Sequence, residues 1–444
     1  MQHRATFLLF FGLGLCSLTT KAQQLNTAKL DSLLNGLAAN NKMMGSLALS
    51  HEGHVVYSRA FGDAQLTPKM PATPATHYRV GSISKVFTAV MIMQLVEEKK
   101  LALTTPLATF FPQLPNAATI TIDQLLSHRS GLHSLTDDAA YLTYMNQPKT
   151  QTELLAIMAA PKADFEPGAK FVYSNTNFIL LGYIVEKLTR MPFAQALQKR
   201  IATKVGLKNT YYGGKIDAKK QEAQSYETTA SGWKLNSETD MSIPGGAGAV
   251  VSTPADLDRF MEALFGGKLV SAASLEQMKT IRDGYGRGLM QMPFGSKLSY
   301  GHGGAIDEFM SMMSYFPDDK LAITVCTNGR NYNLNDAMLG VLNIYFGKPY
   351  RIPNFTVSSF MPAATDLDRY AGTYGSPQFP LKITVSREGA ILKAQATGQG
   401  AFPLEAVSKD IFKFDGAGIR MEFDAAKPTF VLLQGGKSVP FTKE

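Results

Sequence analysis

The sequence contains little cysteine and, beyond its first residues, no long apolar run. Cys16 falls in an N-terminal segment that we expect to be removed, which leaves Cys326 without a partner for an internal disulfide. No later apolar stretch approaches the roughly 18 residues of a membrane helix, so we expect no integral membrane span after that removal. Basic residues number 44 and acidic ones 36, a formal charge of +8, but no block of like charge concentrates it. The even charge argues against a dedicated nucleic-acid-binding protein.

Residues 1–22 carry the pattern of a secretory signal peptide. Arg4 supplies a positive start, an apolar run from Phe7 to Leu15 follows, and Thr20-Lys21-Ala22 places small residues where a signal peptidase reads them. The run is short for a bilayer span, and an uncleaved membrane anchor stays open as the alternative. We therefore expect a periplasmic or secreted protein.

The length of 444 residues and the apolar content of 45% predict a globular protein with more than one domain. A helix is expected over Leu25–Met43, followed by a hairpin of Ser46–Ser50 and Val55–Phe61. Ile83–Lys99 has a broad apolar face and predicts a strong helix. Further helices are expected at Ile122–Ser127, Thr152–Ala159, Phe178–Thr189, Phe193–Ile201 and Pro254–Leu264, and buried strands at Phe309–Phe316 and Leu321–Thr327. This order predicts an α+β domain with an antiparallel sheet flanked by helices, which we place at residues 23–352.

The pattern of expected secondary structure changes after residue 352. A loop-like linker is expected over 353–364 and a second domain over 365–444. Short strands at even spacing predict a small antiparallel β-barrel there. The expected strands are Tyr370–Tyr374, Leu381–Val385, Ile391–Ala396, Phe402–Ala406, Ile411–Phe414, Arg420–Phe423 and Thr429–Leu433.

The informative chemical motif is S-x-x-K at the start of the strong helix. Ser82 and Lys85 are three residues apart, so their side chains share one helix face. A serine hydroxyl is a weak nucleophile that needs a neighbouring base, and a lysine amine is a base only when it is neutral. Neutrality near pH 7 requires a shift from about 10.4, which burial at the helix start can produce. A second match, Ser231 with Lys234, has no helical pattern and is interpreted as chance.

Two further motifs follow in order along the chain. Tyr173-Ser174-Asn175 is a Y-x-N that comes after a turn and just before a helix, whereas Tyr144-Met145-Asn146 lacks that setting. Gly301-His302-Gly303-Gly304 occurs once, and glycines on a strand let a ligand approach the backbone closely.

The three motifs in this order resemble the penicillin-recognising serine enzymes: the β-lactamases, especially class C, the D-alanyl-D-alanine carboxypeptidases and the related esterases. Longer phrases agree over roughly residues 25–350, namely GSISKVFTA, IDQLLSHRSGL, EPGAKFVYSN, GAVVSTPADLDRF, GHGG and SYFPDDKLAITVCTN. The resemblance implies a β-lactamase/transpeptidase-like fold for this region. The terminal barrel resembles the lipocalin-like domain attached to some members of the family.

The resemblance also implies roles for individual residues. Ser82 would be the nucleophile that is acylated, and Lys85 and Tyr173 would share the proton transfers, with Tyr173 as the base of deacylation. The division between these two side chains stays open. Asn175 would hold the substrate amide and Lys85. The backbone N–H groups of Ser82 and Ala305 would form an oxyanion hole, in which one donor is worth about 2.7–4 kcal/mol.

The remaining positions of the motif are assigned to substrate binding. Gln124 falls where class C enzymes carry an amide-binding glutamine, and Gly304 belongs to the strand that borders the substrate. His302 and Gly303 replace the lysine and threonine of the family's K-T-G. A histidine is only partly charged near neutrality and glycine has no hydroxyl, so we expect weak recognition of a substrate carboxylate.

Alternatives remain for the neighbouring acids and histidines. Asp307 and Glu308 could select a cationic substrate group, but solvent-exposed loop acids are the simpler interpretation. A metal site is not expected, because His128, His133, Asp137 and Asp138 lack an H-x-x-x-H helix, and the histidines of the 51–54 turn should face solvent.

We therefore expect a secreted serine hydrolase without metal or cofactor, acting on a small-molecule or peptide substrate. D-alanyl peptidase or esterase activity is favoured over efficient β-lactamase activity. The alternative is a penicillin-binding sensor or cell-wall-binding protein that is acylated without turnover. Neither the natural substrate nor the oligomeric state follows from the sequence.

Overall fold

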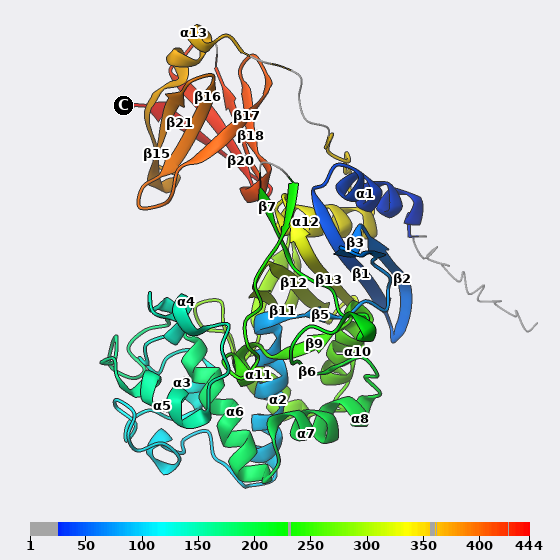
Figure 1. Cartoon of the computed structure of the whole chain (residues 1–444), viewed down its shortest axis with the longest axis vertical. Helices are drawn as coiled ribbons and strands as arrows, with labels where there is room; N and C mark the ends of the chain where they lie inside the picture. The colour runs from blue at the N-terminus through cyan, green and yellow to red at the C-terminus, as the bar shows by residue number, and fades with distance from the viewer. Residues whose placement is uncertain (1–24, 230–231, 356–359, 361, 425) are drawn as a thin grey trace, which may run out of the picture.

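The computed structural model describes residues 25–229, 232–355, 360, 362–424 and 426–444. The expected signal peptide at 1–22 lies outside them. In Figure 1 the C-terminal barrel lies at one end of the molecule, the helical region at the other, and the main sheet between them. Within the described residues, no helix has the length and apolar character to cross a membrane.

The main sheet is antiparallel along its path and follows the order β10-β11-β12-β13-β1-β2. The expected hairpin at residues 46–61 is confirmed, because β1 pairs with β2 through the turn at 51–54. Strand β13 lies next to β1, which brings the end of the catalytic region back to its start. The strands are β1 (Met43–His51), β2 (His54–Phe61), β10 (Met290–Phe294), β11 (Lys297–Ile306), β12 (Phe309–Phe316) and β13 (Leu321–Arg330), with β7 (Tyr226–Thr229) and β8 (Gly232–Leu235) attached at the end of β13.

Helices cover both faces of this sheet. The terminal helices α1 (Thr27–Ala39) and α12 (Leu334–Tyr345) share one apolar core with β1, β12 and β13. Helix α10 (Pro254–Phe265) packs on the other side of β1, β12 and β13. The helix expected over Leu25–Met43 therefore ends earlier, because Met43 already belongs to β1.

Helix α2 (Ser84–Glu97) is the centre of the helical region. Residues 84–95 are all buried, including Thr88 and Gln94. The sequence predicts one apolar face, whereas the structure surrounds the helix with α6, α9 and the β11 side of the sheet. A helix that is buried on every side gives a fixed mount for the residues at its start.

Shorter elements complete the catalytic region. The helices are α3 (Ile122–Leu126), α4 (Tyr141–Tyr144), α5 (Gln151–Ala159), α6 (Asn175–Thr189), α7 (Phe193–Leu197), α8 (Thr203–Val205), α9 (Gly245–Gly248) and α11 (Ala272–Met278). The strands are β3 (Asp63–Leu66), β4 (Lys69–Pro71), β5 (Tyr78–Arg79), β6 (Tyr211–Tyr212) and β9 (Val250–Ser252), of which β5, β9 and β6 form a small sheet.

In the described part of the C-terminal region, eight antiparallel strands form a closed barrel, which confirms the expected architecture. Its inward side chains are apolar and include six buried aromatic rings, so the interior is a packed core. The elements are α13 (Ala364–Leu367), β14 (Gly372–Ser376), β15 (Phe379–Glu388), β16 (Ile391–Ala396), β17 (Phe402–Ser408), β18 (Ile411–Phe414), β19 (Ile419–Phe423), β20 (Thr429–Gln434) and β21 (Lys437–Lys443). The barrel contacts the catalytic domain through an ion pair of 2.7 Å between Asp415 and Lys42.

Candidate active site

Ser82 lies in a short 3₁₀ turn, η1 (Gly81–Ile83), directly before α2. Gly81 has a φ of +50°, and a Cβ there would meet the Ala305 backbone at 2.6 Å, so the turn requires glycine. The Ser82 side chain is partly exposed, whereas Lys85 is completely buried one turn further. The S-x-x-K spacing thus presents a nucleophile to solvent and hides its neighbouring amine.

The Lys85 amine contacts three oxygen atoms. Nζ lies 2.8 Å from Ser82 Oγ, 2.8 Å from Asn175 Oδ1 and 2.9 Å from the carbonyl oxygen of Ala247. Burial lowers the pKa of Lys85 well below its usual value and favours the neutral amine. A neutral amine has two N–H donors, and the two carbonyl oxygens can only accept. The lone pair of Nζ then faces the Ser82 hydroxyl, which is the arrangement of a base with its nucleophile.

Asn175 is held in one orientation. Its Nδ2 donates to Thr136 Oγ1 at 3.0 Å, so its Oδ1 faces Lys85. Its backbone N–H donates to Ser134 Oγ at 3.1 Å. Thr136 was not among the predicted site residues, because nothing in the local sequence distinguishes it from other loop threonines.

Tyr173 lies just before α6, with its phenol near Ser82. A side-chain hydrogen bond with Ser82 favours a lower pKa, but burial is the larger effect and raises the pKa of Tyr173 well above its usual value. Lys85 Nζ lies 4.9 Å from the centre of the Tyr173 ring. The structure therefore brings Ser82, Lys85 and Tyr173 together, and Tyr173 is a protonated phenol near pH 7 rather than a standing anion.

His128 packs against Tyr173. Its ring stacks on that of Tyr173 at 4.2 Å, and its Nδ1 accepts a hydrogen bond from the Ser174 backbone at 3.1 Å. Burial lowers the pKa of His128 well below its usual value, so the ring is neutral. His133, the other histidine of this region, pairs with Asp164 at 3.0 Å.

The H-G-G motif lies within β11, directly before the apolar strand β12. A Cβ at Gly304 would lie 1.9 Å from the Val80 carbonyl oxygen, so this strand passes very close to the nucleophile turn. At Gly303 the nearest atom would be 3.8 Å away, which leaves open space. Ala305 is exposed and borders the cavity beside Ser82, where its N–H can serve in the predicted oxyanion hole.

His302 is buried and is not among the residues that line the cavity beside Ser82. Its Nε2 lies 3.0 Å from the hydroxyl of Tyr285, and its Nδ1 contacts the carbonyl oxygen of Gly303. A carbonyl can only accept, so Nδ1 carries the proton and Tyr285 donates to Nε2. Burial lowers the pKa of His302 to about 3, and the ring supplies no positive charge at neutral pH. Its predicted contact with substrate stays a prediction.

The structure does not bring Gln124 to the cavity. Its Oε1 accepts the Thr121 N–H at 2.9 Å and its backbone N–H donates to Thr121 Oγ1 at 3.3 Å, a capping box at the start of α3. The cap occupies the Oε1 atom of Gln124, and its predicted contact with a substrate amide stays a prediction.

A cavity of about 590 Å³ opens beside Ser82. Asn175 and Ala305 border it near the nucleophile, and most of its walls are apolar. Among the described residues that line it, none is lysine or arginine. The apolar lining consists of Leu135, Tyr141, Leu142, Met145, Ile179, Ile243, Pro244, Ala247, Ala305 and Ile306.

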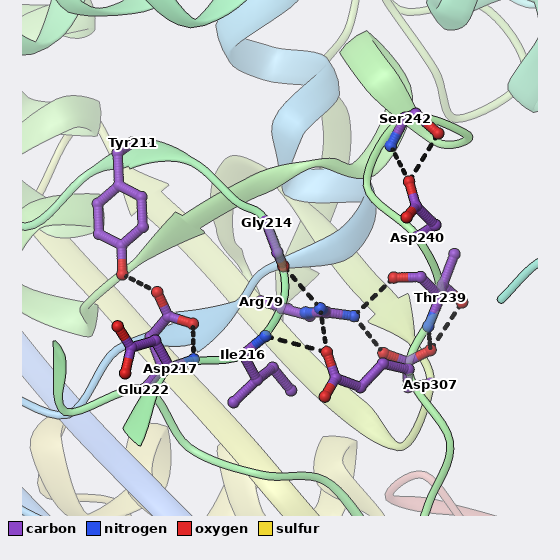
Figure 2. A network of polar contacts seen from close by, with 11 residues as sticks. Arg79, Tyr211, Gly214, Ile216, Asp217, Glu222, Thr239, Asp240, Ser242 and Asp307 are labelled. Atoms are coloured by element: carbon purple, nitrogen blue, oxygen red, sulfur yellow. Dashed lines mark hydrogen bonds and ion pairs between the residues drawn. The ribbon is translucent and has the colours of Figure 1, made fainter. Parts of the chain in front are cut away.

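Asp307 is not an exposed loop acid and does not present a free carboxylate to the cavity. Its side chain is completely buried and pairs with Arg79 at 2.9 Å (Figure 2). Both earlier interpretations of Asp307 are therefore wrong, because an arginine distant in sequence neutralises it. Glu308 is half-buried, and this desolvation raises the pKa of its carboxyl group.

A serine in the turn directly before a buried helix, next to a completely buried lysine and a tyrosine, defines a serine hydrolase site of the S-x-x-K type. The β-lactamase family model matches residues 30–342. The chain belongs to the β-lactamase family, and its catalytic domain is a serine β-lactamase-family hydrolase domain.

Individual relatives are hydrolases or penicillin-binding proteins. Penicillin-binding protein 4* of Bacillus subtilis is 26% identical over 92% of this chain and 96% of its own length. The teichoic acid D-alanine hydrolase of Staphylococcus aureus is 23% identical over 69% of this chain and 74% of its own length. The D-amino acid amidase of Ochrobactrum anthropi SV3, solved with D-phenylalanine, has a TM-score of 0.65 and 27% identity, covering 72% of this chain and 99% of that one.

Proposed function

We propose that the protein hydrolyses amides, esters or peptides of D-amino acids through an acyl-enzyme on Ser82, with a preference for substrates whose leaving group carries no carboxylate. The distance of 2.8 Å between Ser82 Oγ and the buried Lys85 amine carries this proposal. The names of the D-amino acid amidase and the teichoic acid D-alanine hydrolase support the D-configured acyl group.

Each proton has a place in the proposed reaction. Lys85 Nζ takes the Ser82 proton as Oγ attacks the substrate carbonyl, and the N–H groups of Ser82 and Ala305 stabilise the oxyanion. The leaving amine or alcohol departs with the proton that Lys85 took, relayed through the Tyr173 hydroxyl. A water molecule then attacks the ester, gives its proton to the same pair, and releases the carboxylic acid and free Ser82.

Two observations favour a neutral leaving group. His302 stands where a cationic lysine binds carboxylates in the family pattern, but its pKa of about 3 leaves it uncharged. Gly303 offers no hydroxyl beside it. A substrate carboxylate would thus lose its hydration without gaining a charged partner at these positions.

The acyl group is expected in the cavity. Ser82 and Ala305, the proposed nucleophile and one proposed oxyanion donor, both border it. The apolar walls suit a large apolar side chain on the acyl part of the substrate.

The test compares D-phenylalanine amide, its L-enantiomer, p-nitrophenyl butyrate and N-acetyl-D-Ala-D-Ala as substrates. We expect the D-amide and the ester to be turned over with at least a tenfold higher kcat/KM than the dipeptide with its free carboxylate. Ser82→Ala and Lys85→Met should abolish turnover. Lys234→Met is the matched control, because it alters the chance S-x-x-K copy, whose lysine is exposed and pairs with Glu227.

Three results would contradict the proposal. Turnover that persists in Ser82→Ala would remove the nucleophile, and rapid nitrocefin hydrolysis would favour a β-lactamase. A stoichiometric penicillin adduct that lasts for hours, without turnover of any substrate, would favour the alternative of a penicillin-binding sensor.

A periplasmic or secreted location is proposed from the pattern of residues 1–22 alone, and fractionation of producing cells would test it.

A further inference from the structure

Arg79 occupies the strand end that leads directly into the nucleophile turn. It is the last residue of β5, and only Val80 and Gly81 separate it from Ser82. Its side chain is 3% exposed. The guanidinium therefore acts inside the protein, three residues from the catalytic serine.

The Arg79 guanidinium joins segments that are far apart in the sequence (Figure 2). Nη1 donates to the Thr239 carbonyl oxygen and to Asp307 Oδ2, each at 2.9 Å. Nη2 donates to the Gly214 carbonyl oxygen and to Glu238 Oε2, each at 2.9 Å. The planar fork of an arginine can satisfy this fixed set of acceptors, whereas a lysine cannot.

Asp307 completes the connection from the other side. It lies two residues beyond Ala305, at the end of β11, with a φ of +53°. Its Oδ1 accepts the backbone N–H of Thr239 at 2.9 Å and the Thr239 hydroxyl at 2.7 Å. Both carboxylate oxygens are thus occupied by protein groups, and a substrate amine would have to displace them.

Each residue of the Arg79–Asp307 ion pair lies close in sequence to one of the two proposed oxyanion donors. Ser82 follows Arg79 by three residues, and Ala305 precedes Asp307 by two. Both N–H groups must lie about 2.7–3.1 Å from one developing oxygen, and a misplacement of about 1 Å can cost about a hundredfold in rate. A link that fixes residue 79 to residue 307 fixes the separation of these donors.

The same link holds one wall of the cavity. Thr239 and Asp307 both line it, and the phenol of Tyr141 forms a side-chain hydrogen bond with Thr239 from the opposite helix α4. The backbone N–H of Asp240 donates to the Met145 carbonyl oxygen at 2.8 Å, which joins the same two segments again. The position of this cavity wall therefore depends on Thr239 and Asp307, which the ion pair with Arg79 holds in place.

We propose that Arg79 and Asp307 are positioning residues, whose buried ion pair sets the spacing of the Ser82 and Ala305 N–H groups and anchors the Thr239 wall. This inference rests on the proposed function, because it concerns the geometry of the same oxyanion site. A purely structural ion pair would support folding without a specific effect on the chemical step.

The test measures kcat and KM separately for Asp307→Asn, Arg79→Lys and Thr239→Val, with p-nitrophenyl butyrate as substrate. The fraction of competent enzyme is counted by stoichiometric labelling with a fluorophosphonate, and kcat is expressed per labelled site. We expect Asp307→Asn and Arg79→Lys to lower kcat by about tenfold to a hundredfold with KM changed less than about threefold. Thr239→Val keeps the backbone bond to Asp307 and should lower kcat by only a few-fold.

The matched control is Asp415→Asn, which breaks the ion pair with Lys42 between the barrel and the catalytic domain. This pair is also largely buried, with side chains 6% and 15% exposed, and lies outside the proposed site. Asp415→Asn should lower the melting temperature and leave kcat unchanged. If Asp307→Asn does not fold, the kcat values of Arg79→Lys and Thr239→Val decide.

A wild-type kcat per labelled site in the folded Arg79 and Asp307 variants would overturn the inference, as would a change confined to KM. Failure of the proposed function is a separate result, because Ser82→Ala would then retain turnover or the wild type would show none. The labelling yield of the wild type distinguishes the two cases.

Discussion

Replacing Lys85 with methionine is expected to change how the stability of the protein depends on pH. Burial lowers the pKa of Lys85 in the folded state, whereas the unfolded chain returns it to about 10.4. Between those two values the unfolded state binds one more proton than the folded state. The free energy of unfolding of the wild type therefore rises with pH in this window, because a higher pH opposes that proton uptake.

The size of the effect follows from the proton count. One proton changes the free energy of unfolding by about 1.36 kcal/mol per pH unit. If the amine is neutral throughout the range from pH 7 to pH 9, as a general base requires, the wild type should gain about 3 kcal/mol relative to Lys85→Met. Deprotonating a free lysine at pH 7 costs about 5 kcal/mol, which is a large part of the stability of an ordinary domain.

Chemical unfolding at pH 7, 8 and 9, at constant ionic strength, measures this difference. Trp233 is the single tryptophan and lies in β8, so its fluorescence follows the catalytic domain rather than the barrel. Ser82→Ala is the control, since it removes the hydroxyl and keeps the titrating lysine, and its slope should match the wild type. Equal slopes in the wild type and Lys85→Met would mean that Lys85 keeps its proton in the folded protein, which would refute its role as base.

Three further outcomes are expected from local geometry. Asp258 is fully buried, and burial raises its pKa, so the wild type loses stability as the pH rises above about 3.9. Asp258→Asn should therefore raise the melting temperature more at pH 8 than at pH 5. An equal gain at both pH values would contradict this prediction. Gly304→Ala should disrupt folding and activity, because its Cβ would lie 1.9 Å from a carbonyl oxygen. Gly303→Ala should melt like the wild type, because the nearest atom to its Cβ would be 3.8 Å away. Similar melting of the two variants would refute the packing argument. Tyr285→Phe leaves the buried Nε2 of His302 without its donor and should lower stability by about 1–3 kcal/mol, and an unchanged melting curve would count against that hydrogen bond.

Much of the fold could be predicted because its patterns are local. The hairpin at 46–61, the helix Pro254–Phe265 and the short barrel strands each show the expected period and turn residues. Strand β21 (Lys437–Lys443) was not predicted, because it has charged ends and contains Pro440. Its place is set by closure of the barrel between β20 and β14, a contact between distant residues.

The proximity of the three proposed catalytic residues could be predicted for a different reason. Ser82, Lys85 and Tyr173 stand in short motifs whose order along the chain resembles a known family, so the pattern indicated a site that composition could not. The amide of Asn175 lies where its motif implies, 2.8 Å from Lys85. The motif gave no sign that the Gln124 side chain also caps a helix, because that bond depends on the local geometry at Thr121.

The supporting residues could not be predicted from local sequence. The Ala247 carbonyl contacts Lys85 as a backbone group, so its side chain carries no signal. Arg79 and Asp307 are 228 residues apart, and each looks like an ordinary surface charge until folding buries both. The neutral state of His302 likewise depends on its complete burial beside Tyr285.

The most direct test of the account is to locate the acyl-enzyme. Wild-type protein is mixed with p-nitrophenyl butyrate, quenched in acid within milliseconds, digested and analysed by mass spectrometry. The account predicts a butyryl group on the peptide that contains Ser82, and no adduct in Ser82→Ala or Lys85→Met. Turnover by the wild type with the acyl group on another residue, or with no adduct at all under conditions in which acylation is faster than deacylation, would contradict it.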